Sequence, residues 1–365
     1  MERIIPKVVT RTLVIIIVLS NVQFSVNVAG QYNGENNKLP ESDCRYSAKP
    51  LRSVPATDLY RLGRDLMADS GRTDPQLPCW FDPNLARVGQ RFARTNFAQL
   101  VIAHFLSLFL LLANPDIRRI LYFTMRSGDP ENAYKRYIAT ALHAKLWYDV
   151  DILHANLSTS VRKVRNIHRG TAFRIEDENL DFTRPLVEPG KNPNGFEPRR
   201  DMWEAFRRDV EESLPMLGLK PGKLVRDRPK YFFNQYLMSV TQWSFMALPL
   251  LHTNPLAFVF VSEHDLKGFA HLWAGLAYML GMDENYILCK DQNLLECYRY
   301  TKVMEREYFL SYLYEIDYEA EIMLESLLRV SVITAVKLNI SEQSPLRKNV
   351  MLCRNSLKNL EASAT

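Results

Sequence analysis

The sequence lacks the patterns that mark several large functional classes. Its 365 residues contain no run of five or more like charges, no glycine-rich phosphate loop, no alternation of strand and helix patterns and no internal repeat. The 46 basic and 41 acidic side chains leave a net charge of only +5. We therefore expect no nucleic-acid partner, no P-loop or dinucleotide-binding fold and no repeat array.

Cysteine is also scarce, and its spacing does not fit a structural zinc site. The chain has five cysteines, Cys44, Cys79, Cys289, Cys297 and Cys353, which allow at most two disulfides in an oxidising compartment. A short loop would bring Cys289 and Cys297 together, but on a continuous helix they would lie about 12 Å apart. Cys44 and Cys79 lie in an irregular N-terminal region, so the sequence favours a Cys44–Cys79 bridge over this second pair.

The N-terminus has the pattern of a secretory signal. Basic residues at Arg3, Lys7 and Arg11 precede the apolar segment LVIIIVLS, and the small residues of VNVAG precede Gln31. Polar residues interrupt the apolar run well before the roughly 20 residues that a membrane anchor needs. Cleavage near Gly30 is therefore favoured over anchoring, and the mature chain is expected in the secretory pathway, secreted or in the ER lumen.

The composition divides the chain into four parts. We expect a signal peptide over 1–30, a flexible lead-in over 31–50, one domain over 51–340 and a C-terminal tail over 341–365. The sequons at Asn156 and Asn339 fit a secreted glycoprotein. Asn339 is the preferred glycan site, because Asn156 lies on a predicted helix.

Hydrophobic periodicity predicts an all-α fold. One helix is expected over 83–114, whose segment LVIAHFLSLFLLLA is apolar nearly all round, as in a central buried helix or one that lies on a membrane surface. Asp129 and Pro130 open the next helix as its N-cap and first position. A long loop rich in Pro, Gly and Asn covers 176–199, and further helical patterns follow to about residue 338.

A histidine lies on the apolar side of the helix predicted over SVRKVRNIHRG. Leu157, Val161, Val164 and His168 recur at helical spacing, whereas Arg162, Asn166 and Arg169 lie on the opposite side. A buried imidazole needs a hydrogen-bond partner or a metal. The segment alone favours a hydrogen-bonded core histidine over a metal ligand.

The preceding helix carries a polar and aromatic stripe. Arg136, Thr140, His143 and Trp147 fall at i, i+4, i+7 and i+11. The alternative is a solvated helix face. Because Thr140 precedes His168 by twenty-eight residues, two antiparallel helices would let this stripe face the histidine across one pocket.

These helices resemble a known family. The segment RYIATALHAKLWYDVD, then VRKVRNIH, with PCWFDPNLARVGQRF before them and NQYLMSVTQWSFM and FAHLWAGLAYMLGM after them, is similar to the catalytic domain of ER-bound oxygenases and bacterial rubber oxygenases, the latex-clearing proteins. The resemblance runs from about Pro78 to about Tyr300 and is greatest to the animal branch.

The resemblance implies a single globin-like helical bundle that encloses haem b. It implies His168 as the axial ligand of the haem iron, with Arg136 and Thr140 near the haem, where a guanidinium holds a propionate or polarises oxygen and a hydroxyl donates a hydrogen bond. It further implies an oxygenase that uses molecular oxygen on a small apolar substrate, such as an isoprenoid or another lipid. Peripheral membrane contact is expected only if the apolar segment within 83–114 is the membrane-surface helix rather than a buried one.

Two departures from the family bear on activity. Leu237 stands where relatives commonly have an aspartate, and Ala274 stands where they commonly have an arginine. If these two groups pair in relatives, the loss of both leaves no unpaired charge. A secreted protein that binds haem or another hydrophobic ligand without turnover is therefore the alternative function.

The remaining polar residues favour structural roles. His264 and His271 share a helix face, but their spacing of seven differs from that of metal ligands on adjacent turns. Ser239, Thr241 and Ser244 have no nucleophile-elbow sequence, so a hydrolase triad is not expected.

Overall fold

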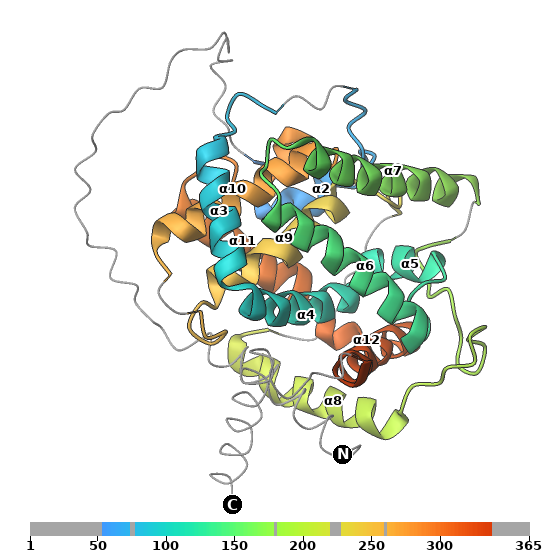
Figure 1. Ribbon diagram of the computed structural model, residues 1–365. Helices are drawn as coiled ribbons and strands as arrows, with labels where there is room; N and C mark the ends of the chain where they lie inside the picture. The colour runs from blue at the N-terminus through green and yellow to red at the C-terminus, as the bar shows by residue number, and fades with distance from the viewer. Residues whose placement is uncertain (1–52, 74–76, 179–180, 220–227, 259–260, 338–365) are drawn as a thin grey trace, which may run out of the picture.

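The computed structural model describes residues 53–73, 77–178, 181–219, 228–258 and 261–337. Within these ranges the chain forms eleven α-helices and no strand, which confirms the all-α prediction (Figure 1). The helices run in the order α2 (Leu59–Gly63), α3 (Pro83–Thr95), α4 (Phe97–Ala113), α5 (Pro115–Phe123), α6 (Pro130–Asp149), α7 (Ala155–Asp177), α8 (Arg200–Ser213), α9 (Gln235–Leu251), α10 (Glu263–Met279), α11 (Leu294–Glu305) and α12 (Tyr318–Lys337). Short 3-10 turns η1 (Ala56–Asp58), η2 (Leu214–Leu217), η3 (Glu284–Tyr286) and η5 (Ser311–Glu315) and a π-helical turn η4 (Arg306–Leu310) connect them.

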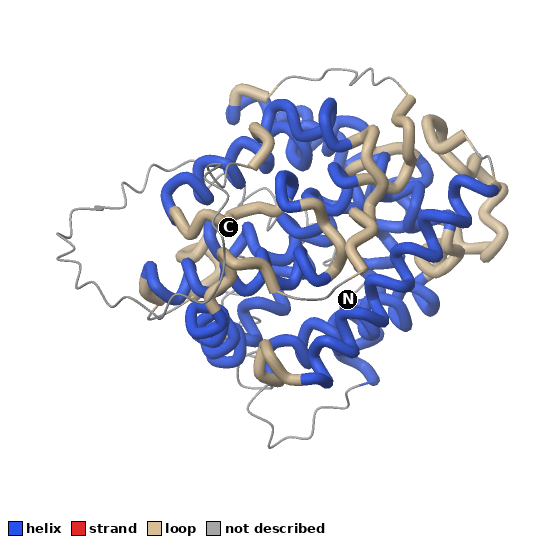
Figure 2. The backbone as a smooth tube through the Cα atoms, turned by 90° about the horizontal axis from the view of Figure 1, so that it is seen from above, coloured by secondary structure: helices blue, strands red, loops and turns tan. Residues whose placement is uncertain are grey.

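Helix α9 is buried along nearly its whole length and packs against α4, α10 and α11 (Figure 1). Figure 2 shows the described part of the chain from above as helices joined by loops. Trp243 of α9 and Trp273 of α10 are almost completely buried. Helix α3 crosses α10 at a contact between Gly89 and Gly268, where a Cβ on Gly89 would lie 2.2 Å from the carbonyl oxygen of Gly268. The absence of side chains at this crossing allows the two backbones to touch.

The predicted helix over 83–114 is two helices. Helices α3 and α4 meet at Asn96 with a bend of 92°. The Asn96 side chain donates to the Phe92 carbonyl at 3.1 Å, and its backbone leaves the helical region at φ −109° and ψ 30°, so it ends α3. Among the described helices none is by itself long and apolar enough to cross a membrane. The bent pair α3 and α4, taken together, has the length and the apolar composition of a membrane-spanning segment.

Other predicted elements are confirmed. Asp129 accepts hydrogen bonds from the backbone N–H groups of Glu131 and Asn132 and so caps α6. The segment between α7 and α8 is irregular, apart from residues 179 and 180, which are not described. It is tied to α12 because Glu319 and Glu325 accept, each at 2.6 Å, from the N–H groups of Leu186 and Arg199.

Cys289 and Cys297 form a disulfide with a Cα–Cα distance of 5.0 Å. The chain between them is a turn: η3 ends at Tyr286, Cys289 has a φ of 60°, and α11 begins at Leu294. The sequence argument against this bridge assumed a continuous helix and is wrong. Cys79 is also disulfide-bonded, but Cys44 lies outside the described residues, so the Cys44–Cys79 pairing stays a prediction.

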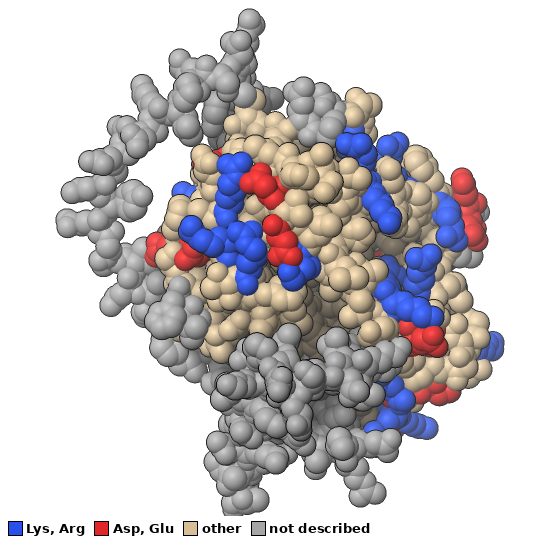
Figure 3. Space-filling model, in the orientation of Figure 1, with Lys and Arg blue, Asp and Glu red and all other residues tan. Residues whose placement is uncertain are grey.

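Several sequence predictions concern parts outside the described residues. These are the signal peptide over 1–30, the lead-in over 31–50, the tail over 341–365 and the sequon at Asn339. The other sequon residue, Asn156, is exposed in the first turn of α7. On the face shown in Figure 3, acidic and basic side chains are interspersed, with Lys and Arg more frequent toward the right, over α6 and α7.

Candidate functional site

Helices α6 and α7 form an antiparallel pair that is joined at the end near residues 150–154. His143 Nδ1 of α6 lies 2.8 Å from Ser160 Oγ of α7, and Trp147 Nε1 donates to the same oxygen at 2.9 Å. Two members of the predicted stripe therefore face α7. Arg136 and Thr140, on the same side of α6, continue this stripe away from the joined end.

The two helices separate beyond this contact (Figure 1). All four residues of the turn 139–142 of α6 are exposed, and Leu142 is 65% exposed. On α7, Ile167 is 56% exposed. A mid-helix turn exposed on every side, beside a diverging helix, indicates open space along this part of α6.

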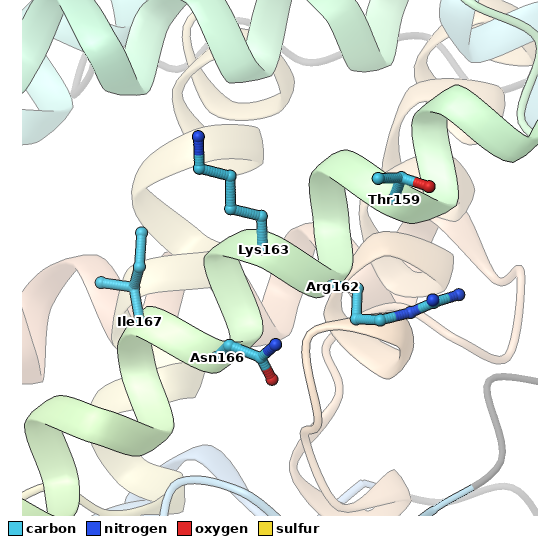
Figure 4. Close-up of a pocket in the computed structure, with 5 residues that line it drawn as sticks. All are labelled: Thr159, Arg162, Lys163, Asn166 and Ile167. Carbon is cyan, nitrogen blue, oxygen red and sulfur yellow. The ribbon is translucent and has the colours of Figure 1, made fainter.

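Two hollows are lined by side chains of α7, and His168 lines neither of them. One is a shallow surface depression lined by Thr159, Arg162, Lys163, Asn166 and Ile167 (Figure 4). In Figure 4, Lys163 and Ile167 point to one side of α7, whereas Arg162 and Asn166 point to the other. Neither this depression nor the larger hollow described below is lined by His168, Arg136 or Thr140.

His168 lies on the inner face of α7, as the periodicity predicts. Leu157 and Val161 of the same stripe are buried, and the imidazole packs edge-on against Phe233 with ring centroids 5.7 Å apart. Its Nδ1 is buried and has no hydrogen-bond partner. Burial, and then the charge of Arg136, lower the pKa of His168 to about 4, while Asp69 opposes them. The ring is therefore neutral at pH 7, the form that binds a metal.

Arg136 is a largely buried cation. Its Nη1 donates to the Leu121 carbonyl at 3.1 Å and to the Thr124 and Ser127 hydroxyls at 2.6 and 3.3 Å. No carboxylate of the described residues pairs with it, and burial lowers its pKa. A buried guanidinium held only by neutral acceptors favours the binding of an anion.

Thr140 is exposed, and its hydroxyl donates to the Arg136 carbonyl at 3.2 Å. It therefore lies one turn from Arg136 on the side of α6 where the helices separate. The side chain is within the predicted stripe, but its hydroxyl contacts only its own helix.

The described residues contain no cluster of three or more His, Cys, Asp or Glu side chains that could hold a metal ion. A metal site built entirely from side chains is thus unsupported in this part of the chain. A single neutral imidazole fits a metal that brings its other ligands with it, as iron in a porphyrin does. His168 could supply that single imidazole ligand. Arg136, which has no carboxylate partner among the described residues, adds a positive charge near it.

The other histidines and hydroxyls have structural environments. His271 is buried, accepts the Asp82 N–H at 2.8 Å through Nε2 and stacks on Phe81, whereas His264 is exposed. The hydroxyls of Ser239, Thr241 and Ser244 donate to backbone carbonyls of α9 or of Tyr286. These contacts support the structural interpretation of both groups.

Leu237 and Ala274 are both completely buried. An aspartate or an arginine at these positions would have to be desolvated, which is costly without a partner. The two apolar residues therefore fit the core of this chain as it is.

Sequence analysis missed the ion pair between Arg165 and Asp69. Arg165 Nε and Nη2 bind the two Asp69 carboxylate oxygens at 2.7 and 2.6 Å, and Arg169 Nε lies 3.6 Å from the same carboxylate. The recurrence of Arg162, Arg165 and Arg169 at i, i+3 and i+7 was a signal for one basic side of α7. The position of Asp69 beside it had no local signal.

No protein-family model, no curated protein and no solved structure matches the chain.

Proposed function

We propose that the chain is a haem-dependent oxygenase-like protein in which His168 is the axial ligand of a haem b iron. One observation carries the proposal: a neutral imidazole with an unpartnered, buried nitrogen lies near a buried guanidinium that has no carboxylate partner. The resemblance of the α6, α7, α9 and α10 segments to rubber oxygenases and ER-bound oxygenases supports the same assignment.

Each residue would have a distinct task toward the haem. His168 would bind the iron, and the charge of Arg136 would attract a haem propionate. The Thr140 hydroxyl, one turn from Arg136, would offer a hydrogen bond. Bound haem would supply the activation of molecular oxygen for the oxidative cleavage or oxygenation of an apolar substrate such as an isoprenoid.

The chain's own residues would keep the site apolar and neutral. Burial keeps the His168 ring unprotonated, so its lone pair stays available. The Phe233 ring, which packs edge-on against His168, would supply an apolar side chain beside the ligand.

Haem binding is tested by spectroscopy. Chain expressed with haem available should show a Soret band and stoichiometric haem, and His168→Ala should lose both. His264→Ala, which removes an exposed histidine, is the matched control and should keep the spectrum. Stoichiometric haem in His168→Ala would overturn the ligand assignment, and a featureless spectrum of the folded parent chain would favour a protein without this cofactor.

A second function, haem or hydrophobic-ligand binding without turnover, is favoured by Leu237 and Ala274, which replace charged residues with buried apolar ones. The two functions differ in turnover. Haem-loaded protein is incubated with oxygen and an unsaturated isoprenoid, and carbonyl products are measured by mass spectrometry. Product in multiple turnovers excludes the binding protein.

A further inference from the structure

A basic hollow of about 540 Å³ lies between α7 and the segment that follows α2. Four arginines line it, Arg72, Arg162, Arg165 and Arg169, together with polar groups that include Ser158 and Asn166. Three of these arginines are at i, i+3 and i+7 of α7 and so project from one side of the helix. The lining contains no carboxylate.

The arginines are fixed in different ways. Arg72 Nη2 donates to the carbonyls of Tyr278 and Met282 at 2.8 and 2.7 Å, and its guanidinium lies 3.8 Å from the centre of the Tyr278 ring. Arg165 is held by Asp69 and donates to the Arg72 carbonyl at 2.7 Å. Two of the four guanidinium groups are thus held in place before any ligand binds.

The positive charge of the hollow is not balanced. Asp69 is the carboxylate that pairs with Arg165 and Arg169, and it offsets one charge. Arg72 binds neutral carbonyl oxygens, and Arg162 has no ion-pair partner among the described residues. Four arginines and one carboxylate leave an excess of three positive charges around a concave surface, which attracts a multiply charged anion.

We propose that this hollow binds a compact anion that bears two or more phosphate groups. Guanidinium groups bind phosphate oxygens through paired hydrogen bonds, and a fixed guanidinium loses little conformational entropy on binding. The volume is in the range of small-molecule sites. His168 does not line this hollow, so the proposal does not depend on haem.

Inorganic pyrophosphate is the probe, and its binding to the full chain is measured by calorimetry at physiological salt. The double variant Arg162→Gln with Arg169→Gln should weaken binding by about tenfold or more, because each lost charge-assisted contact is worth over 1 kcal/mol. Lys163→Gln is the control for the single variant Arg162→Gln, since each removes one positive charge and the two side chains point to different sides of α7 (Figure 4). Lys163→Gln should change affinity by less than about twofold.

The outcomes separate the site from general electrostatic attraction. Absence of saturable binding overturns the proposal, and so does an equal loss of affinity in Lys163→Gln. If the double variant does not fold, the single Arg162→Gln carries the test, because Arg162 has no ion pair to lose. Vesicles that contain phosphatidylinositol bisphosphate, a lipid whose headgroup bears more than one phosphate, identify the source of the anion: binding that pyrophosphate displaces supports a lipid headgroup in the hollow, and pyrophosphate binding without vesicle binding supports a soluble ligand.

Discussion

Arg165, in the middle of α7, donates two hydrogen bonds of 2.7 and 2.6 Å to the carboxylate of Asp69, which lies 96 residues earlier in the sequence. The two side chains are only 12% and 10% exposed. The backbone N–H of Gly71 also donates to Asp69, at 2.8 Å. This ion pair connects α7, the helix that carries His168, to the segment that follows α2.

Loss of this pair should destabilise the fold. Removing one partner of a desolvated ion pair leaves the other uncompensated, so Asp69→Asn should lower the free energy of unfolding by about 3 kcal/mol. The control Asp58→Asn breaks an exposed pair with Arg61 and should cost less than about 1 kcal/mol. Urea unfolding at pH 7 measures both, and equal effects would contradict the role assigned to Arg165.

The same pair predicts acid sensitivity. Burial alone would raise the pKa of Asp69, but the hydrogen bonds from Arg165 and Gly71 and the charges of Arg165 and Arg169 outweigh burial and lower it. A lowered folded-state pKa gives stability that is fully present above the ordinary pKa of an aspartate and is lost as pH falls below it. In the acid range, Asp69→Asn should therefore lose less stability than the parent chain.

Histidine 271 makes a separate contribution to the pH dependence. Burial first, and the charge of Lys267, lower the pKa of His271 to about 4, against the opposing effect of Asp82. Its Nε2 accepts the Asp82 N–H, which a protonated ring could not do. Because the unfolded chain takes up a proton near pH 6.5 and the folded chain does not, stability falls between about pH 6.5 and pH 4.

The measurement compares two histidine variants. From pH 7 to pH 5 the parent chain should lose about 2 kcal/mol of unfolding free energy through His271. His271→Gln should be less stable at pH 7, because the buried ring is lost, and should lack this part of the pH dependence. The exposed control His264→Gln should keep the parent's pH dependence, and an unchanged slope in His271→Gln would refute the assignment.

The disulfide should stabilise the region before α11. Closing a loop of this length lowers the conformational entropy of the unfolded chain, which raises its free energy by about 2–3 kcal/mol. Cys289→Ser with Cys297→Ser should therefore unfold at lower urea concentration than the oxidised parent, and the two proteins should differ much less after reduction. Peptide mapping without reductant checks the bridge itself, and also tests Cys44–Cys79, since recovery of both Cys44 and Cys79 as free thiols would rule that bridge out.

Local signals in the sequence predicted the helices that depend on local chemistry. The N-cap at Asp129 and the apolar stripe that ends in His168 need only neighbouring residues to be recognised, and both are present. Of the predicted stripe on α6, His143 and Trp147 contact α7 through Ser160, as expected of successive helices joined by a short connection. Arg136 instead donates to Leu121, Thr124 and Ser127, contacts that the spacing did not predict.

Long-range contacts could not be predicted in this way. The apolar pattern runs through Asn96 without a break, and the bend there accompanies the packing of α3 against α10 at Gly89 and Gly268. The position of Asp69 beside α7 likewise depends on how distant segments fold together. Periodicity reports which side of a helix is buried, but it carries no information on what that side contacts.

The crossing of α3 and α10 predicts opposite effects of the same substitution at two glycines. In Gly89→Ala the new Cβ would lie 2.2 Å from the Gly268 carbonyl oxygen, so α3 must shift away from α10. We expect a loss of about 2–3 kcal/mol, typical of overpacking at a tight contact. Gly170→Ala is the matched control, because Gly170 is within α7 and its Cβ would meet nothing within 4 Å. There alanine should raise stability by about 0.5–1 kcal/mol through its better helix propensity. Urea midpoints of the two variants decide the point, and a stable Gly89→Ala would show that the backbones of α3 and α10 do not touch in solution.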